Sequence, residues 1–145
     1  MRQASRAVII RDNSLLVMKR NKFGSEYYVL IGGGVDMGET IEKSLLREVK
    51  EETGLEVSQF RKVWVEEAGP PYGTQHIFLC NDPGGEPQMQ PDSDEASLNA
   101  RGQNTYHPVW LPLDQLASAE FRSGKLKHAI ITAVKQGFPE AVVVL

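Results

Sequence analysis

Alternation of apolar and polar residues predicts a series of short strands. Residues 5–10 and 15–20 are rich in aliphatic side chains, and the polar residues 12–14 between them indicate a hairpin turn. Further strand patterns occupy 27–31, 57–67, 74–81 and 109–111. Prolines and glycines at 69–73 predict a turn that joins two of these strands as antiparallel neighbours.

Two segments show helical spacing instead. Ile41, Leu45 and Val49 recur at intervals of four and form an apolar stripe, which predicts a helix over 40–53. Residues 125–136 repeat apolar positions with the same period and predict a second helix.

Two other segments fit neither period. Residues 82–104 combine acidic residues, prolines and glycines, which indicates a long loop. Residues 141–145 form an apolar tail for which a final strand, a core plug and a dimer contact all remain open. Because no linker interrupts the pattern, we expect one domain over 1–145.

Composition narrows the class of protein. The 145 residues carry a net charge of −3, and the chain is long enough for one self-sufficient core. A single cysteine excludes an intrachain disulfide framework and a multi-cysteine zinc site. The apolar runs are too short to span a membrane, and no basic stripe indicates binding to long nucleic acid. We therefore expect a cytoplasmic protein that acts on a small molecule, with a homodimer left open.

The first predicted helix carries an unusual set of acids. At about 100° per residue from Ile41, Glu52 falls near about 20°, Glu48 near about 340° and Glu51 near about 280°. Three carboxylates thus share an arc beside the apolar stripe, at the helix end that disfavours anions. Such a cluster calls for a compensating cation, and oxygen ligands suit Mg²⁺ or Mn²⁺. Pairing of the acids with Arg47 and Lys50 is the simpler alternative.

Glycines precede this helix. Gly32, Gly33 and Gly34 directly follow a strand pattern, and glycine lets a backbone approach a ligand closely. A glycine turn alone is common in loops. A glycine turn that leads into a helix with carboxylates on one face is more specific and favours the metal-site interpretation.

Residues 33–55 carry a recognisable motif. They read Gly-Gly-Val-Asp-Met-Gly-Glu-Thr-Ile-Glu-Lys-Ser-Leu-Leu-Arg-Glu-Val-Lys-Glu-Glu-Thr-Gly-Leu. The segment resembles the signature of the Nudix hydrolases, in which Gly, Glu, Arg-Glu, Glu-Glu and Gly recur at fixed spacing, and every fixed position is filled. The rest of the chain resembles the family only loosely.

The resemblance implies a fold and a reaction. The fold would be a Nudix-type α/β/α sandwich with a mixed sheet and a loop–helix–loop catalytic motif. Members of the family use a divalent metal ion to hydrolyse a nucleoside diphosphate linked to another moiety. Carried over by position, Glu48, Glu51 and Glu52 would bind the metal together with the Gly32 carbonyl. Residues expected to support the loop and helix are Gly33, Gly38 and an ion pair between Glu39 and Arg47.

Some roles stay open at this point. The general base would be Glu48 or, from the long acidic loop, Glu95. Tyr72, Tyr106 and Phe23 could stack on a nucleobase, although aromatic residues more often pack in cores. A nucleoside triphosphate is the first substrate choice, with ADP-ribose or another nucleotide sugar as the alternative. A non-catalytic sensor of nucleotides on the same fold is the competing function.

Overall fold

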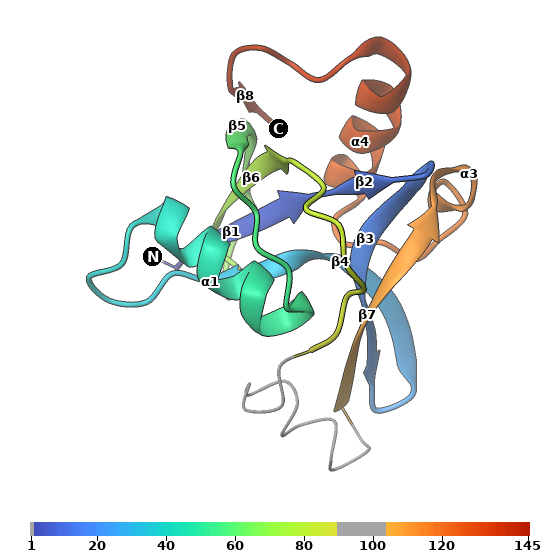
Figure 1. The fold of residues 1–145 in the computed structure, drawn as a ribbon, viewed down its shortest axis with the longest axis horizontal. Coiled ribbons are helices and arrows are strands. Elements are labelled where there is room, and N and C mark those ends of the chain that lie inside the picture. Colours follow the sequence, from blue (N-terminus) through green and yellow to red (C-terminus); the bar gives the residue numbers. More distant parts are fainter. Residues whose placement is uncertain (1, 90–103) are drawn as a thin grey trace.

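The computed structural model describes residues 2–89 and 104–145, and Figure 1 shows their arrangement. The strands are β1 (Gln3–Val8), β2 (Ile10–Arg11), β3 (Ser14–Lys22), β4 (Ser25–Gly34), β5 (Phe60–Glu67), β6 (Thr74–Cys80), β7 (Asn104–Pro112) and β8 (Val143–Val144). The helices are α1 (Ile41–Thr53), α3 (Leu113–Leu116) and α4 (Gly124–Gln136). No helix in these two ranges is long and apolar enough to cross a membrane.

The strands form one mixed sheet that bends along β4. Its order is β2-β3-β4-β1-β6-β5-β8, and β7 pairs with the other edge of β3. The first part of β4 pairs antiparallel with β3, and its last residues, Ile31 to Gly34, pair antiparallel with β1. Strands β1 and β6 run parallel, as do β5 and β8. Strand β4 therefore joins the two halves of the sheet, and its glycine-rich end pairs with β1.

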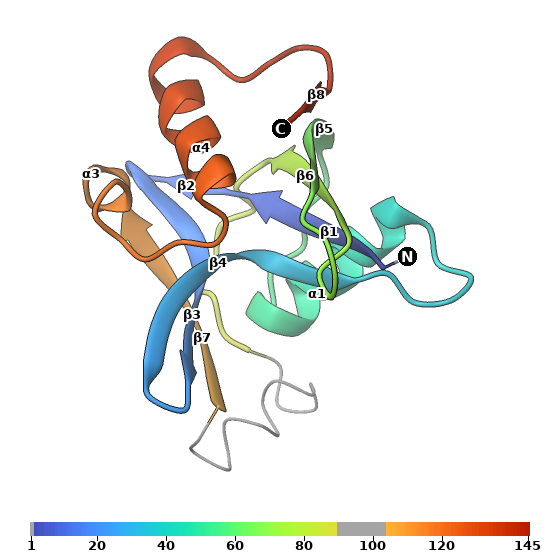
Figure 2. The same cartoon turned by 180° about the vertical axis from the view of Figure 1, so that it is seen from behind.

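Helices cover both faces of the sheet, which gives the expected α/β/α layers. Leu45 and Val49 of α1 are fully buried against one face, in a cluster with Ile31 and Phe78. Leu126 and Ile130 of α4 pack on the other face in a second cluster. Figure 2 shows the two helices on opposite sides of the strands.

Local sequence defines both ends of α1. The Thr40 hydroxyl accepts a hydrogen bond from the Lys43 N–H, which satisfies one of the free donors of the first turn. Gly54 adopts a left-handed conformation with φ of 73° and donates its N–H to the Lys50 carbonyl. The helix predicted over 40–53 is therefore confirmed, together with the physical signals that limit it.

The predicted first hairpin is only partly correct. Asp12 and Asn13 form the turn with positive φ, but of the strand residues before the turn only Ile10 and Arg11 pair with β3. The segment before them, β1, pairs instead with β4 and β6. Both faces of β1 are buried, and a strand in that position needs neighbours on both edges that a local hairpin cannot supply.

Three other boundaries differ from the sequence pattern. The strand expected from residue 57 begins at Phe60, and the buried residue Val57 packs from a loop. The strand expected over 109–111 runs from Asn104 to Pro112 and pairs along all of β3. The apolar tail forms strand β8 on the edge of the sheet, so the strand alternative is confirmed.

Candidate active site

The glycine turn and α1 are locked together by Glu52 and Glu48. The Gly32 N–H donates to Glu52 Oε1 at 2.9 Å, and the Glu52 side chain is only 3% exposed. A Cβ built on Gly33 would lie 2.7 Å from Glu48 Oε1, so any side chain there would displace the Glu48 carboxylate. The glycine turn therefore approaches two buried carboxylates directly.

Arg47 forms hydrogen bonds both to the loop before α1 and to two acids of α1. Its guanidinium donates to both carboxylate oxygens of Glu39, at 2.8 and 3.0 Å, so the expected ion pair is present. The bidentate bond raises the pKa of Arg47 and lowers the pKa of Glu39. Arg47 also contacts Glu48 at 3.0 Å, Glu51 at 3.2 Å and the carbonyl of Gly34 at 3.1 Å.

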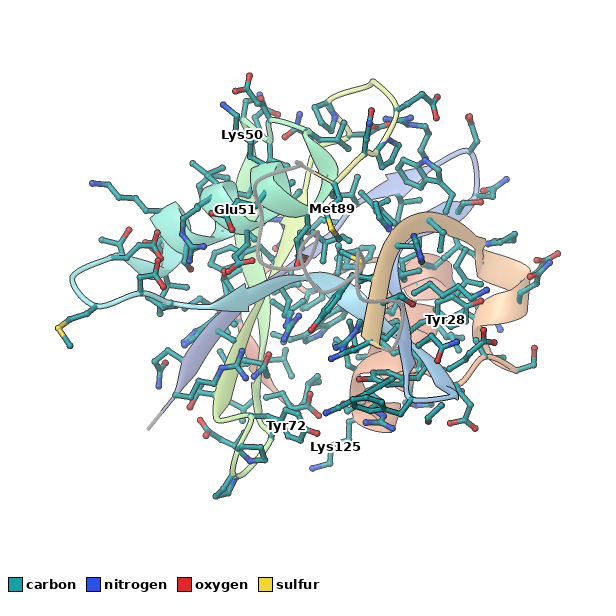
Figure 3. All side chains as sticks on the ribbon, turned by 90° about the horizontal axis from the view of Figure 1, so that it is seen from below. Tyr28, Lys50, Glu51, Tyr72, Met89 and Lys125 are labelled. Carbon is teal, nitrogen blue, oxygen red and sulfur yellow. The ribbon has the colours of Figure 1, made fainter. Side chains whose placement is uncertain are left out.

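The donor chemistry at this site fits a divalent cation, although the acids are not gathered into a closed cluster. Within residues 2–89 and 104–145, no three His, Cys, Asp or Glu side chains converge as metal ligands. The Glu51 carboxylate lies 3.2 Å from Arg47 Nη1, and the Glu51 side chain is 42% exposed. Figure 3 shows Glu51 on α1. The Gly32 carbonyl accepts from Arg6 Nη1 at 3.2 Å. Without a cation between them, like-charged carboxylates repel one another and each accepts hydrogen bonds from a different donor. A divalent ion would take the place of those donors. Buried Glu48 and Glu52, both carboxylates, nevertheless supply the hard oxygen atoms that Mg²⁺ prefers.

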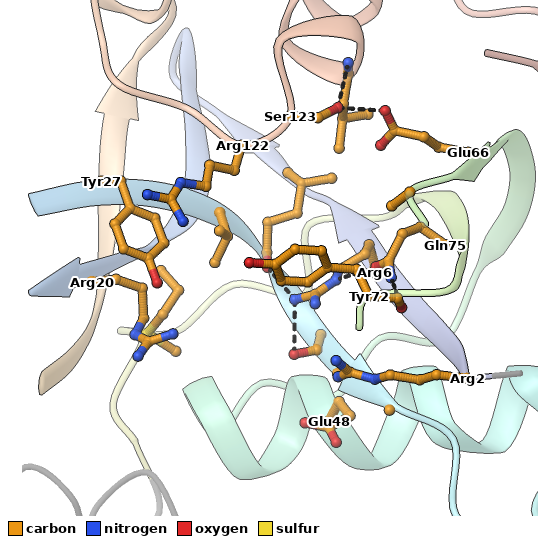
Figure 4. A pocket seen from close by; sticks show the side chains of 18 of the residues that line it. Arg2, Arg6, Arg20, Tyr27, Glu48, Glu66, Tyr72, Gln75, Arg122 and Ser123 are labelled. Carbon is orange, nitrogen blue, oxygen red and sulfur yellow. Dashed lines mark hydrogen bonds between the residues drawn. The ribbon is translucent and has the colours of Figure 1, made fainter. Parts of the chain in front are cut away.

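A cavity of about 700 Å³ opens beside these acids. Its walls come from β1, the glycine end of β4, the turn between β5 and β6, and the N-terminal end of α4 (Figure 4). The size suits a nucleotide-like ligand. Glu48 and Glu52 both line the cavity, and Ser123 at the start of α4 lies across from Glu48.

Several arginines line the cavity. Arg6 is held in place by hydrogen bonds to Gln75 Oε1 at 3.0 Å and to the carbonyl oxygens of Leu30 and Gly32. Arg2 lies against Gly34, and its side chain forms no hydrogen bond or ion pair within the described residues. These cations surround the carboxylates with positive charge, as an anionic substrate would require.

Aromatic side chains and two further arginines form a second wall. The Arg122 guanidinium lies 3.9 Å from the centre of the Tyr27 ring, and Arg20 lies 3.6 Å from the centre of the Tyr106 ring. Arg20 also approaches Tyr27, at 5.6 Å. Alternating rings and guanidiniums provide flat surfaces on which a planar group could stack.

The predicted aromatic contacts divide into two groups. Tyr72 and Tyr106 line the cavity, as a base-stacking role would need. Phe23 does not, because it occupies the tip of the β3–β4 turn with its side chain 70% exposed. The candidate base Glu95 lies outside the described residues. Gly38 has a φ of 80° and allows the turn before α1, consistent with the structural role expected of it.

Other cavity residues were missed by the sequence analysis. Arg2, Arg6, Arg122 and Glu66 belong to no motif and come from segments far apart in the chain. Arg6 alone carried a usable signal, because it is a charged residue within a strand whose neighbours are otherwise buried. The others become neighbours only through the parallel pairing of β1 with β6 and the position of α4.

Taken together, the layers and the site define an α/β protein with a glycine turn and an acid-bearing helix at a nucleotide-sized cavity. The family model described as NUDIX domain matches residues 1–130. The chain belongs to the NUDIX domain family, as its motif indicated.

Relatives of known name agree with this assignment. The chain is 39% identical over 127 residues to the human protein named 8-oxo-dGDP phosphatase NUDT18, covering 86% of this chain and 36% of the relative. It is 36% identical over 96 residues to an ADP-ribose pyrophosphatase of Methanocaldococcus jannaschii, covering 63% and 57% respectively. The chain thus spans less than two thirds of the length of these relatives.

Solved structures show the same fold. The crystal structure of a MutT NUDIX hydrolase from Burkholderia pseudomallei superposes with a TM-score of 0.59 at 25% identity. The match covers 78% of this chain and 84% of that one. The expected α/β sandwich of the Nudix type is therefore confirmed.

Proposed function

We propose that this protein hydrolyses the pyrophosphate bond of a nucleoside diphosphate derivative with the help of Mg²⁺ or Mn²⁺. One observation carries the proposal: the buried carboxylates Glu48 and Glu52 stand at a cavity that is otherwise rich in arginine. Arg47 pairs with Glu48 at 3.0 Å and the Gly32 N–H donates to Glu52, so both carboxylates are held at the cavity wall. Carboxylates repel substrate phosphates, and a divalent ion between the carboxylates and the phosphates would remove that repulsion.

The residues that would hold the ion are Glu48, Glu51 and Glu52, with the Gly32 carbonyl as a further donor. A divalent ion bound there would neutralise phosphate charge and lower the pKa of a bound water. Glu51 can reach such an ion because, among the described residues, only an exposed bond to Arg47 holds its side chain. Of the described acids, Glu48 is the proposed general base, since its carboxylate lines the cavity and lies against Gly33.

Two arginines would bind the substrate's phosphates. Arg6 is fixed by three hydrogen bonds and presents a rigid positive charge beside Glu52. Arg2 has no partner among the described residues, so its donors are available to phosphate oxygens. A preorganised cation such as Arg6 stabilises charge without reorganising during the reaction.

The direct test is Glu52→Gln. Glutamine retains an oxygen that can accept from the Gly32 N–H, so the fold should survive while the negative charge is lost. We expect hydrolysis to fall by at least about 100-fold, as for loss of a group that acts in the transition state. The matched control is Glu42→Gln, an exposed acid on the same helix. Equal activity of the Glu52 variant and the wild-type protein would refute the assignment.

The substrate is best sought with a panel. The named activities of the relatives suggest oxidised guanine nucleotides and ADP-ribose, alongside ordinary nucleoside triphosphates and nucleotide sugars. Product masses after incubation with Mg²⁺ or Mn²⁺ identify both the substrate and the bond that breaks. A nucleotide that binds tightly but is recovered intact would favour a sensor instead.

A further inference from the structure

Glu66 is a buried acid in the cavity that takes no part in the proposed reaction. It lies on β5 with a side chain 6% exposed, and it belongs to the cavity lining. The one described hydrogen bond of its side chain comes from the Ser123 hydroxyl, at 2.5 Å from Glu66 Oε2. Among the described residues it forms no ion pair. A carboxylate accepts up to about four hydrogen bonds, so most of this capacity is unused.

The position of Glu66 separates it from the acids of the glycine turn. Figure 4 shows Glu66 beside Ser123 at one end of the cavity and Glu48 at the other. The Ser123 hydroxyl also accepts from the Leu126 N–H, so Glu66 is anchored to the first turn of α4 and held in one orientation. A fixed carboxylate with free lone pairs selects hydrogen-bond donors at that end of the cavity.

Charge decides which part of a nucleotide can face Glu66. A phosphate group would be repelled by this carboxylate, whereas Arg2 beside Glu48 attracts phosphates at the other end, with Arg6 between the two ends. The uncharged part of the substrate therefore faces Glu66. The aromatic residue Tyr72 also lines the cavity and offers a planar surface for a base.

We propose that Glu66 determines specificity for a nucleobase with two adjacent N–H donors, as guanine presents at N1 and N2. The two oxygens of a carboxylate match such a pair of donors in a bidentate arrangement. Adenine offers one donor beside an acceptor and would leave one carboxylate oxygen unpaired. The inference rests on the proposed function only for the assumption that the cavity takes a nucleotide.

The test is equilibrium binding of GMP, IMP and AMP, measured by calorimetry in metal-free buffer. These monophosphates contain no pyrophosphate bond, so hydrolysis cannot affect the result. We expect wild-type protein to bind GMP at least about tenfold more tightly than AMP, with IMP between them because it lacks the second donor.

Two variants separate recognition from structure. Glu66→Gln keeps an oxygen for Ser123 but replaces the second acceptor with a donor, so the preference for GMP should fall below about twofold. Glu67→Gln removes the same charge from the next residue, whose carboxylate accepts from the Thr74 hydroxyl, and the preference should persist. Thermal melting of both variants confirms that each is folded.

Several outcomes overturn the proposal. These are equal binding of all three monophosphates by wild type, no binding of GMP, an unchanged preference in Glu66→Gln, or its loss in Glu67→Gln. If Glu66 contacted the ribose instead, Glu66→Gln would weaken the binding of GMP, IMP and AMP equally. That result would also refute base selection. Selective GMP binding without any hydrolysis would leave this inference intact and refute the proposed function, whereas hydrolysis without base preference would do the reverse.

Discussion

Two neighbouring glycines should respond very differently to the same substitution. Gly33→Ala places a Cβ 2.7 Å from Oε1 and 2.9 Å from Oε2 of Glu48. The backbone of Gly33 lies in ordinary extended pairing with Ser5, so only the end of a side chain has to move. An off-rotamer shift of that size costs about 0.5–1.5 kcal/mol. For a chain of this length, the melting temperature should fall by about 2–4 °C per kcal/mol.

Activity should suffer far more than stability. Displacement of a reacting group by about 1 Å costs on the order of 100-fold in rate, or about 2.7 kcal/mol of transition-state stabilisation. We therefore expect Gly33→Ala to lose about two orders of magnitude in kcat/KM while it remains folded. The assay is hydrolysis of the best panel substrate, with melting followed by circular dichroism. Gly34→Ala is the control, since its Cβ would meet only the flexible Arg2 side chain at 3.4 Å.

Gly32→Ala should instead fail to fold. Its Cβ would lie 2.0 Å from the Ser5 carbonyl oxygen, and its φ of 144° is unfavourable for a side chain. Backbone atoms in paired strands cannot yield, so a loss of several kcal/mol is expected. If Gly33→Ala retained activity within about twofold of wild type, the close approach of Glu48 would have no catalytic meaning and the reasoning would be wrong.

Three other predictions concern charged and titrating groups. Arg2→Gln should raise KM about tenfold with a smaller effect on kcat, and adding Gly34→Lys should restore binding from the neighbouring position. Because Arg47 lowers the pKa of Glu39, the ion pair stabilises the fold fully above pH 4.5, the pKa of Glu39 in the unfolded chain, and this stability is lost as the pH falls through the folded pKa. In urea titrations, the stability of Arg47→Met should not show this loss at low pH. Burial raises the pKa of the Cys80 thiol from 9.0 to about 12, so stability should decline as the pH rises above 9, and thiol reagents should react only on unfolding.

Features with local causes were the ones that sequence could predict. The apolar stripe of α1, its Thr40 cap and the Gly54 terminus act within a few residues, so the helix and its acids followed from spacing. The ion pair of Glu39 with Arg47 spans only the motif itself. Each of these depends on backbone geometry that neighbouring residues determine.

Features with long-range causes could not be predicted. Strand β1 pairs with residues 74–79 in parallel, and no local pattern specifies that partner. The cavity depends on this pairing, because it brings Arg6 beside Gln75. The same holds for Glu66 and Ser123, which are 57 positions apart and meet only when α4 packs on the sheet. The motif thus identified the reaction class, while the residues proposed to choose the substrate came from tertiary structure.

Arg47 contacts both the loop that it stabilises and the acids proposed to act in the reaction, whereas Glu66 does not. It binds the loop through Glu39 and Gly34 while it also contacts Glu48 and Glu51, so any change at Arg47 alters folding and the acids together. The Glu66 side chain has one described hydrogen bond, from Ser123, and glutamine at this position would retain an oxygen to accept it. If Glu66 selects the base as proposed, single substitutions there would change substrate preference, whereas changes to the proposed hydrolytic step would have to preserve the whole arrangement around Arg47.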